Sequence, residues 1–313
     1  MNARELREEF HRRKHVYGGA LLTFSGMNGY DVYNCSIPFE WEGKRYLFGR
    51  VERREDFANS VTFLFEETER DHYSPVEGAV VYPIEDPHVA LIGDEIILGG
   101  THVRKRRNQI DTLYGYYYRG RDLRFLSHFT CGPANMKDIR LVELQDGRVG
   151  VFTRPRSKRI AEIYGSEAVV GFAILNSINE LDDTIVDKAR VIDGLFAEGE
   201  WGGCNQCYLL KDGRIGVIGH RCYKQPTPEV VLQTYVNIAF IFDPFAFTIS
   251  DMQVIGDKQS YPPTPHMLPY LADCAFTSGI EMRPDGKADL YSGLGDVAQG
   301  RIVIDAPFGD LMA

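Results

Sequence analysis

Five hairpin-like segments, each built around a glycine turn, constrain the fold of this chain more than any other feature. Each segment has two short apolar runs separated by an acidic residue next to glycine, followed by a polar or charged cluster. Such a pair between apolar runs indicates a tight hairpin, because Gly and Asp tolerate the positive φ angles of primed turns. The turn glycines are Gly43, Gly93, Gly147, Gly213 and Gly286, with successive spacings of 50, 54, 66 and 73 residues.

These spacings predict an all-β, five-bladed β-propeller that spans residues 1–313 as a single domain. Each interval is about the length of one four-stranded blade with insertions. A generic β-sandwich is the alternative, but it would not place a charged cluster after every second hairpin strand. Equivalent strand ends converge on the central channel of a propeller, so the charged clusters are expected to share one site.

Residues 3–16 are the one clear helix candidate. Leu6 and Phe10 lie four residues apart on one face, surrounded by Arg and Glu. We expect this helix to lie outside the blades, where it packs against them or contacts a second copy of the chain in a homo-oligomer.

Composition excludes several classes of function. The formal net charge of -9 argues against a surface for nucleic acid or anionic membrane. No apolar run approaches the roughly 18 residues of a membrane span, and the N-terminus lacks the apolar region of a secretory signal. We therefore expect a cytoplasmic protein with reduced thiols. The cysteines are Cys35, Cys131, Cys204, Cys207, Cys222 and Cys274.

The first charged cluster is Glu85-Asp86-Pro87, which precedes an apolar run. Proline disfavours the helical region for the residue before it, so an extended backbone is expected at Asp86. A carboxylate held at a channel mouth could have a raised pKa and act as a general acid. Taken alone, this tripeptide is more often an ordinary turn.

The second cluster contains Lys137, Asp138, Arg140, Arg154 and Arg156. Arg140 and Arg154 occupy opposite strands of one predicted hairpin and could form a fork for phosphate oxygens. The alternative is a solvated charged face.

The third cluster, His220, Arg221, Cys222 and Tyr223, ends a predicted strand. Strand alternation puts His220 and Cys222 on one side and Arg221 and Tyr223 on the other. Both pairs can face a ligand only if the strand has already ended.

No cofactor or metal is expected from the sequence. Cys204-x-x-Cys207 is a single CxxC, and completing a zinc site with His220 and Cys222 would need an irregular spacing. No glycine-rich phosphate loop and no GxSxG motif occurs.

Several segments resemble the mannoside phosphorylases of glycoside hydrolase family 130. In this chain, IEDPHVALIGDEIILGGTHV resembles the Glu-Asp-Pro segment of that family, and MKDIRLVELQDGRVGVFTRPR resembles its Lys-Asp segment. DCAFTSGIEMRPDGKADLYSGLGD resembles the family's final blade, and YNCSIPFEWEGKRYLFGRV resembles its first blade. The resemblance spans roughly residues 28–306. It is closer still to a bacterial and protozoan propeller group related to the β-1,2-mannosyltransferases and phosphorylases of glycosyltransferase family 108.

The resemblance implies inverting phosphorolysis of β-mannosides, β-1,2-linked ones above all, with phosphate or mannose 1-phosphate as the second substrate. Asp86 matches the general acid, which in the family protonates the leaving oxygen through a sugar hydroxyl. The implied phosphate-binding residues are Arg140, Arg154, His220 and Tyr223. The implied substrate-binding residues are Asn34, Arg50, Glu85, Lys137, Asp138 and Asp296. The sequence departs from the family pattern at His88, Ser292 and Gly295, which leaves the sugar and linkage open.

One essential carboxylate suffices for phosphorolysis, because phosphate is already an anionic nucleophile. An inverting hydrolase needs a second carboxylate about 6.5–9.5 Å away to activate water. Glu52 or Glu200 could supply it, so an inverting glycosidase is an alternative. A sugar-nucleotide mannosyltransferase and a non-catalytic glycan-binding propeller are further alternatives.

Overall fold

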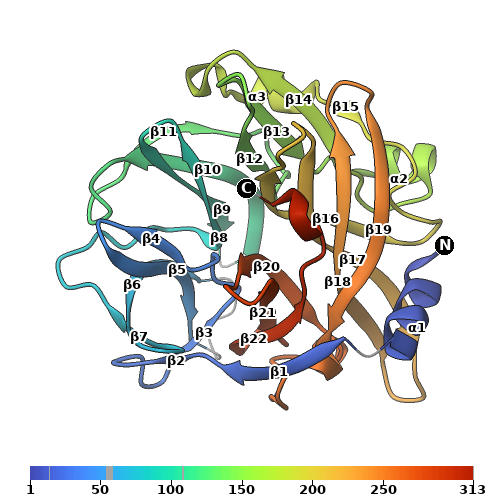
Figure 1. The fold of residues 1–313 in the computed structure, drawn as a ribbon, viewed down its shortest axis with the longest axis horizontal. Coiled ribbons are helices and arrows are strands. Elements are labelled where there is room, and N and C mark those ends of the chain that lie inside the picture. The colour runs from blue at the N-terminus through green and yellow to red at the C-terminus, as the bar shows by residue number, and fades with distance from the viewer. Residues whose placement is uncertain (14, 54–58, 108, 313) are drawn as a thin grey trace.

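Five sheets form a ring in the computed structural model, which describes residues 1–13, 15–53, 59–107 and 109–312 (Figure 1). The predicted five-bladed β-propeller is therefore confirmed. The first strand of each blade lies nearest the centre (Figure 1), the inner strands of blades 2 to 5 contact one another from blade to blade, and blade 1 contacts blades 2 and 5. The inner strands are β3 (Asp31–Tyr33), β8 (Glu85–Ile92), β12 (Arg140–Glu143), β16 (Trp201–Leu209) and β20 (Ala275–Met282).

The remaining strands complete the blades in chain order. Blade 1 adds β5 (Lys44–Glu52), β6 (Val61–Glu69) and β7 (His72–Pro75), with β4 (Phe39–Trp41) on β5 and β2 (Thr23–Phe24) parallel to β7. Blade 2 adds β9 (Glu95–Arg106), β10 (Gln109–Gly120) and β11 (Ser127–Cys131). Blade 3 adds β13 (Val149–Thr153), β14 (Gly171–Leu175) and β15 (Arg190–Val191). Blade 4 adds β17 (Ile215–Pro226), β18 (Val231–Asp243) and β19 (Thr248–Asp257). Blade 5 adds β21 (Lys287–Leu294), β22 (Ala298–Asp305) and β1 (Val16–Leu21).

The N-terminal strand closes the ring, because β1 pairs with β22 as the outer strand of blade 5. The predicted helix over 3–16 is therefore too long: α1 covers Ala3–Arg13, and Val16 already belongs to β1. Gly19 allows this pairing, since a Cβ there would lie 2.8 Å from the Arg301 carbonyl oxygen.

The five turn glycines have the positive φ angles that the hairpin pattern predicts, between 62° and 83°. Gly93, Gly147, Gly213 and Gly286 each join the first and second strands of blades 2 to 5. Gly43 joins β4 to β5 in blade 1. The repeat in the sequence thus marks the same turn in four blades and a neighbouring turn in the first.

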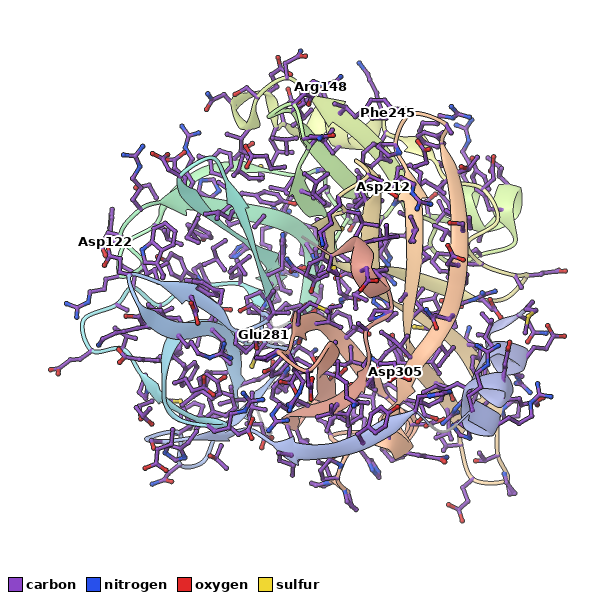
Figure 2. All side chains as sticks on the ribbon, viewed as in Figure 1. Asp122, Arg148, Asp212, Phe245, Glu281 and Asp305 are labelled. Carbon is purple, nitrogen blue, oxygen red and sulfur yellow. The ribbon has the colours of Figure 1, made fainter. Side chains whose placement is uncertain are left out.

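Apolar side chains fill the space between neighbouring sheets (Figure 2). Between blades 3 and 4, Phe152, Phe172 and Phe242 pack with ring centroids 4.8–5.5 Å apart. Helix α1 lies outside the ring beside blade 4 (Figure 1) and places Leu6 in the same cluster. The other helices are α2 (Lys158–Tyr164) and α3 (Asp183–Asp187), with short 3-10 turns at Ile178–Glu180, Lys258–Ser260, Pro269–Leu271 and Gly309–Leu311. None of the helices in the described ranges has the length and apolar character that crossing a membrane requires.

Candidate functional site

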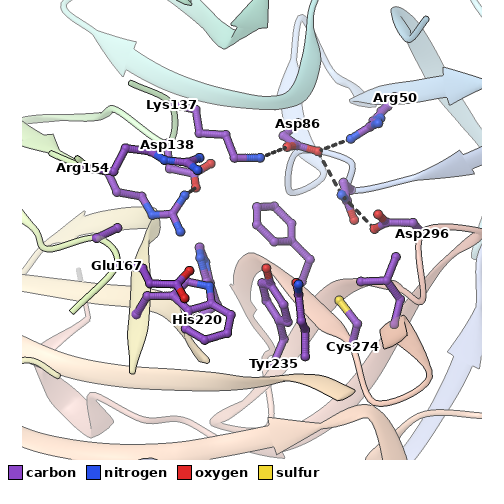
Figure 3. A pocket seen from close by; sticks show the side chains of 17 residues that line it. Arg50, Asp86, Lys137, Asp138, Arg154, Glu167, His220, Tyr235, Cys274 and Asp296 are labelled. Atoms are coloured by element: carbon purple, nitrogen blue, oxygen red, sulfur yellow. Dashed lines mark hydrogen bonds and ion pairs between the residues drawn. The ribbon is translucent and has the colours of Figure 1, made fainter. Parts of the chain in front are cut away.

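A cavity of about 270 Å³ lies among the inner strands and receives side chains from all five blades (Figure 3). Strand ends that are far apart in the sequence supply its polar groups, as the convergence of a propeller predicts. The sequence-predicted residues that line it are Asn34, Arg50, Asp86, Lys137, Asp138, Arg154, His220 and Asp296.

Asp86 is buried, with 3% of its surface exposed, and its carboxylate is held by three neighbours. Arg50 NH1 lies 2.9 Å from Oδ1, and Asn34 Nδ2 donates a hydrogen bond to the same oxygen over 2.9 Å. Lys137 Nζ lies 3.7 Å from Oδ2. Arg50 and Lys137 thus reach Asp86 from different sides of the cavity (Figure 3).

The backbone at Asp86 is not extended, contrary to the expectation from Pro87. Its φ angle is 51°, and the register of β8 against β9 shifts between Glu85 and His88. The bulge re-aims the side chain at the point where the strand meets the cavity. Asn34, Asp138 and Asp296 also have positive φ angles, of 46°, 58° and 57°. Backbone strain of this kind clusters at functional sites.

The charge state of Asp86 also differs from the expectation. Burial by itself raises the pKa of this carboxyl, but Arg50 and Lys137 outweigh it, so the pKa of Asp86 is lowered. The expected raised pKa is therefore wrong. Burial raises the pKa of Glu85 and that of Asp296, against the opposing effect of Arg50 in both cases.

The sugar-side candidates lie next to Asp86. Asn34 Nδ2 also approaches Asp296 Oδ1, at 3.5 Å, while Asn34 Oδ1 is buried without a hydrogen-bond partner among the described residues. Glu85 does not line the cavity and instead holds Arg50, with 3.1 Å between Glu85 Oε2 and NH2. Asn34 therefore keeps a free acceptor beside the ion pair between Arg50 and Asp86.

On the other side of the cavity, Asp138 lies between two arginines. Arg154 NH1 is 2.9 Å from Oδ2, and Arg140 NH2 is 3.3 Å from Oδ1. Burial raises the pKa of Asp138, but Arg154 and Arg140 overcome this and lower it. Arg154 lines the cavity, whereas Arg140 lies behind it and donates from Nε to the Asn205 carbonyl over 2.9 Å. The predicted fork is thus one arginine at the cavity and one that orients Asp138.

His220 presents one ring nitrogen without a partner. Nδ1 lies 2.7 Å from Asn205 Oδ1, and Nε2 is buried with no hydrogen bond in the described part of the chain. Burial, reinforced by Arg154, lowers the pKa of His220 to about 3, so the ring is neutral at physiological pH. The alternation argument holds, because Tyr223 points the other way and its hydroxyl accepts a hydrogen bond from Arg7 over 3.2 Å. Tyr223 does not line the cavity.

The two carboxylates that could have activated water in a hydrolase also lie away from the cavity. Glu200 pairs with Arg221 over 2.6 Å, and Glu52 pairs with Arg50 over 2.7 Å. Neither lines the cavity.

The cavity also contains residues that the sequence analysis did not assign to the site. They are Arg156, Glu167, Ala168, Trp201, Gln233, Tyr235, Leu271, Cys274 and Phe276. Arg156 was visible in the second cluster. Trp201 and Tyr235 carry no local signal, because aromatic residues on strands are more often core. As for the CxxC, no group of metal-ligating side chains is assembled within the ranges that the structure describes.

Comparisons with known proteins agree with this architecture. A mannose phosphorylase from Leishmania mexicana, MPT-4, solved in complex with a phosphate ion, is 48% identical, with a TM-score of 0.92 over 99% of this chain and 96% of that chain. MPT-1 from the same organism, a GDP-Man-dependent mannosyltransferase, is 40% identical, with a TM-score of 0.91 over 98% and 95%. The β-1,2-mannobiose phosphorylase from Listeria innocua is 15% identical, with a TM-score of 0.63 over 89% and 91%, and shares the fold.

The resemblance predicted from the sequence is thereby confirmed. No curated protein matches the chain. One family model, described as a protein of unknown function (DUF1861), matches residues 8–310. The chain therefore belongs to the DUF1861 family.

Proposed function

We propose that this protein is an inverting phosphorylase of β-mannosides, with β-1,2-linked mannosides as the preferred class. One observation carries the proposal: a single cavity holds Asp86 together with Lys137, Arg154 and His220, and Lys137 Nζ lies 3.7 Å from the Asp86 carboxylate. That arrangement pairs one candidate acid with an anion site. The 48% identity to a mannose phosphorylase bound to phosphate supports the same reading.

Phosphate is held by the cationic side of the cavity. Arg154 supplies a planar guanidinium whose NH1 and Nε are fixed on Asp138 and on the Gly202 carbonyl, which leaves NH2 for the phosphate. Lys137 supplies a second positive charge, and His220 Nε2 contacts a phosphate or sugar oxygen. Arg140 acts through Asp138, which it holds in place.

The mannosyl ring lies against Asp86 and Asp296, which Asn34 bridges. Asn34 and Arg50 bind its hydroxyls, and the rings of Trp201, Tyr235 and Phe276, which line the cavity, offer apolar surface to a sugar face. Glu85 keeps Arg50 oriented.

The chemistry needs one proton and one nucleophile. Bound phosphate adds negative charge beside Lys137, which offsets the cation that keeps Asp86 ionised and favours its protonated form. A phosphate oxygen attacks the anomeric carbon as the glycosidic bond breaks, and the proton of Asp86 passes through a sugar hydroxyl to the leaving oxygen. Inversion converts the β-mannoside into α-mannose 1-phosphate and a free alcohol.

A GDP-mannose-dependent mannosyltransferase is the second candidate, favoured by the 40% identity to such an enzyme. It would use the same cationic side for the diphosphate, and it also inverts the anomeric centre. The hydrolase reading is weaker, because Glu52 and Glu200 do not line the cavity.

One experiment separates the three activities. The protein is incubated with β-1,2- and β-1,4-mannobiose, with and without inorganic phosphate, and with GDP-mannose plus mannose as acceptor. We expect mannose 1-phosphate to form only when phosphate and a β-mannoside are both present. GDP release without phosphorolysis would establish the transferase, and free mannose without phosphate would establish the hydrolase.

A further inference from the structure

The N-terminal helix contributes no residue to the cavity, yet its Arg7 binds Asp273, the neighbour in sequence of the cavity residue Cys274. Helix α1 packs against β19 and β17 of blade 4 (Figure 1). Strand β18 pairs with both of these strands and carries Gln233 and Tyr235, which line the cavity. The turn over 268–274, which supplies Leu271 and Cys274, packs against β18 and continues this wall.

Arg7 joins the helix to both parts of the wall. Its NH1 and NH2 bind the two oxygens of Asp273 over 2.6 and 2.9 Å, and its Nε binds Asp257 over 2.7 Å. NH1 also donates to Tyr223 on the β17–β18 hairpin. Only 9% of Arg7 is exposed, so these are buried contacts that hold a fixed geometry.

Asp273 passes this constraint on to the cavity. Its carbonyl oxygen accepts from the Tyr235 backbone N–H over 3.0 Å, and its Oδ2 accepts from Thr234 over 3.0 Å. Cys274, the next residue, forms a β-bridge with Tyr235. A single residue, Asp273, therefore links Arg7 to Tyr235 and Cys274 in the cavity wall.

The first residues of the chain fix the same helix at its other end. The Ala3 backbone N–H donates to Glu200 over 2.6 Å, and Arg221 NH2 donates to the Met1 carbonyl over 3.2 Å. Arg4 NH2 donates to the Lys224 carbonyl over 2.9 Å, with its guanidinium 5.0 Å from the Tyr223 ring centroid. The helix is thus anchored to β17 and to the approach to β16 before Arg7 reaches Asp273.

From these contacts we infer that Arg7 is a positioning residue that sets the sugar-binding wall of the cavity from outside it. Tyr235 and Cys274 of this wall lie across the cavity from Asp86, while the cations come from blades 1 to 3 (Figure 3). Loosening α1 shifts the surface that the mannoside contacts and leaves the cationic side chains of Lys137 and Arg154 in place. The inference rests on the proposed phosphorylase function for its kinetic consequence.

The test compares Arg7→Lys with Arg301→Lys. A lysine retains the charge but cannot bridge two carboxylates as a guanidinium does. Arg301 is a matched control on blade 5, since it also binds two carboxylates, Asp71 and Asp289, and does not line the cavity. Its side chain is 12% exposed, against 10% for Arg7.

Two measurements are made on both variants. In Arg7→Lys, we expect the KM for the mannoside to rise roughly tenfold, less than the ~10²-fold that a misplacement of about 1 Å far from the chemistry can cost, with the KM for phosphate within twofold of wild type. The second measurement is native maleimide labelling followed by peptide mass spectrometry. Cys274 is 2% exposed and should become labelled faster in Arg7→Lys only, with exposed Cys131 and buried Cys204 as internal standards.

The outcomes are separable. Equal labelling of Cys274 in the two variants, or a mannoside KM in Arg7→Lys within twofold of wild type, overturns the inference. If wild type shows no phosphorolysis, the proposed function fails, and Cys274 labelling decides the inference alone. Should Arg7→Lys not fold, Arg4→Ala replaces it: Arg4 is exposed, and loss of its contacts to Lys224 and Tyr223 should increase Cys274 labelling in the same direction.

Discussion

Arg50 NH1 lies 2.9 Å from Oδ1 of Asp86, inside a cavity where the carboxylate is 3% exposed. This ion pair, together with Lys137, lowers the pKa of Asp86 against the effect of burial. The catalytic role proposed for Asp86 therefore depends on the charges that surround it as much as on its own burial.

The first prediction concerns Asp86→Asn. The amide keeps the size of the side chain but cannot supply a proton, so turnover of an unactivated β-mannoside should fall by roughly 10²–10⁴-fold, the usual contribution of a general acid. Steady-state phosphorolysis of mannobiose measures this, with circular dichroism as the check on folding. A mannoside with a good leaving group needs less protonation and should lose less. Near wild-type turnover of mannobiose would rule out Asp86 as the acid.

The second prediction separates Arg154 from Arg140. Arg154→Lys loses a planar contact to phosphate, so the KM for phosphate should rise by an amount equivalent to roughly 1.5–3 kcal/mol, while the KM for the mannoside changes less. Arg140→Lys should mainly lower Tm, because Arg140 binds Asp138 and the Asn205 carbonyl behind the cavity. Initial rates over a phosphate series and thermal unfolding are measured on both variants. If Arg154→Lys lowers Tm and leaves the phosphate KM unchanged, Arg154 only braces the blades.

The third prediction concerns the pH dependence of activity in Lys137→Met. Lys137 lies 3.7 Å from Asp86 and helps to lower the pKa of that carboxyl. Removal of the charge raises the pKa of Asp86, so the acid stays protonated to higher pH. The alkaline limb of kcat/KM should move up by about 1 pH unit, the lower end of the effect of a nearby opposite charge. Lys44→Met, at an exposed pair with Glu66, is the control and should leave the limb in place. If the alkaline limb does not move, or moves to lower pH, Lys137 does not lower the pKa of the catalytic acid.

The fourth prediction concerns stability at acidic pH. Burial lowers the pKa of His220 to about 3, whereas an unfolded histidine titrates near 6.5. Between these values the unfolded chain binds more protons, so the free energy of unfolding falls as pH falls through this window. His220 should contribute a loss of about 2 kcal/mol from pH 7 to pH 5, and buried His88, whose pKa burial also lowers, adds to it.

Urea unfolding of wild type and His220→Gln at both pH values checks this fourth prediction. The variant is expected to be less stable at pH 7, so the slope with pH is compared and not the absolute stability. A slope as steep in the variant as in wild type would contradict the prediction.

Much of the fold could be predicted because the propeller repeats a local signal. A glycine beside an acidic residue between apolar runs specifies a hairpin through backbone sterics alone, as Gly147 and Gly213 show with φ angles of 80° and 83°. The end of the N-terminal helix could not be predicted as well. Val16 leaves the helix because it pairs with Ile304, a partner near the other end of the chain.

For the site, local sequence patterns showed which residues could share a face of a strand, whereas the packing of the blades selects the face that lines the cavity. Alternation along β17 separates His220 from Tyr223, but only the packing of α1 shows that Tyr223 meets Arg7 outside the cavity. The motif around Asp86 placed a carboxylate at a strand end. Its charge state was decided by Arg50 and Lys137, which come from other blades. Sequence patterns report local geometry, whereas pKa and burial are set by charges and side chains that only folding brings within a few ångströms.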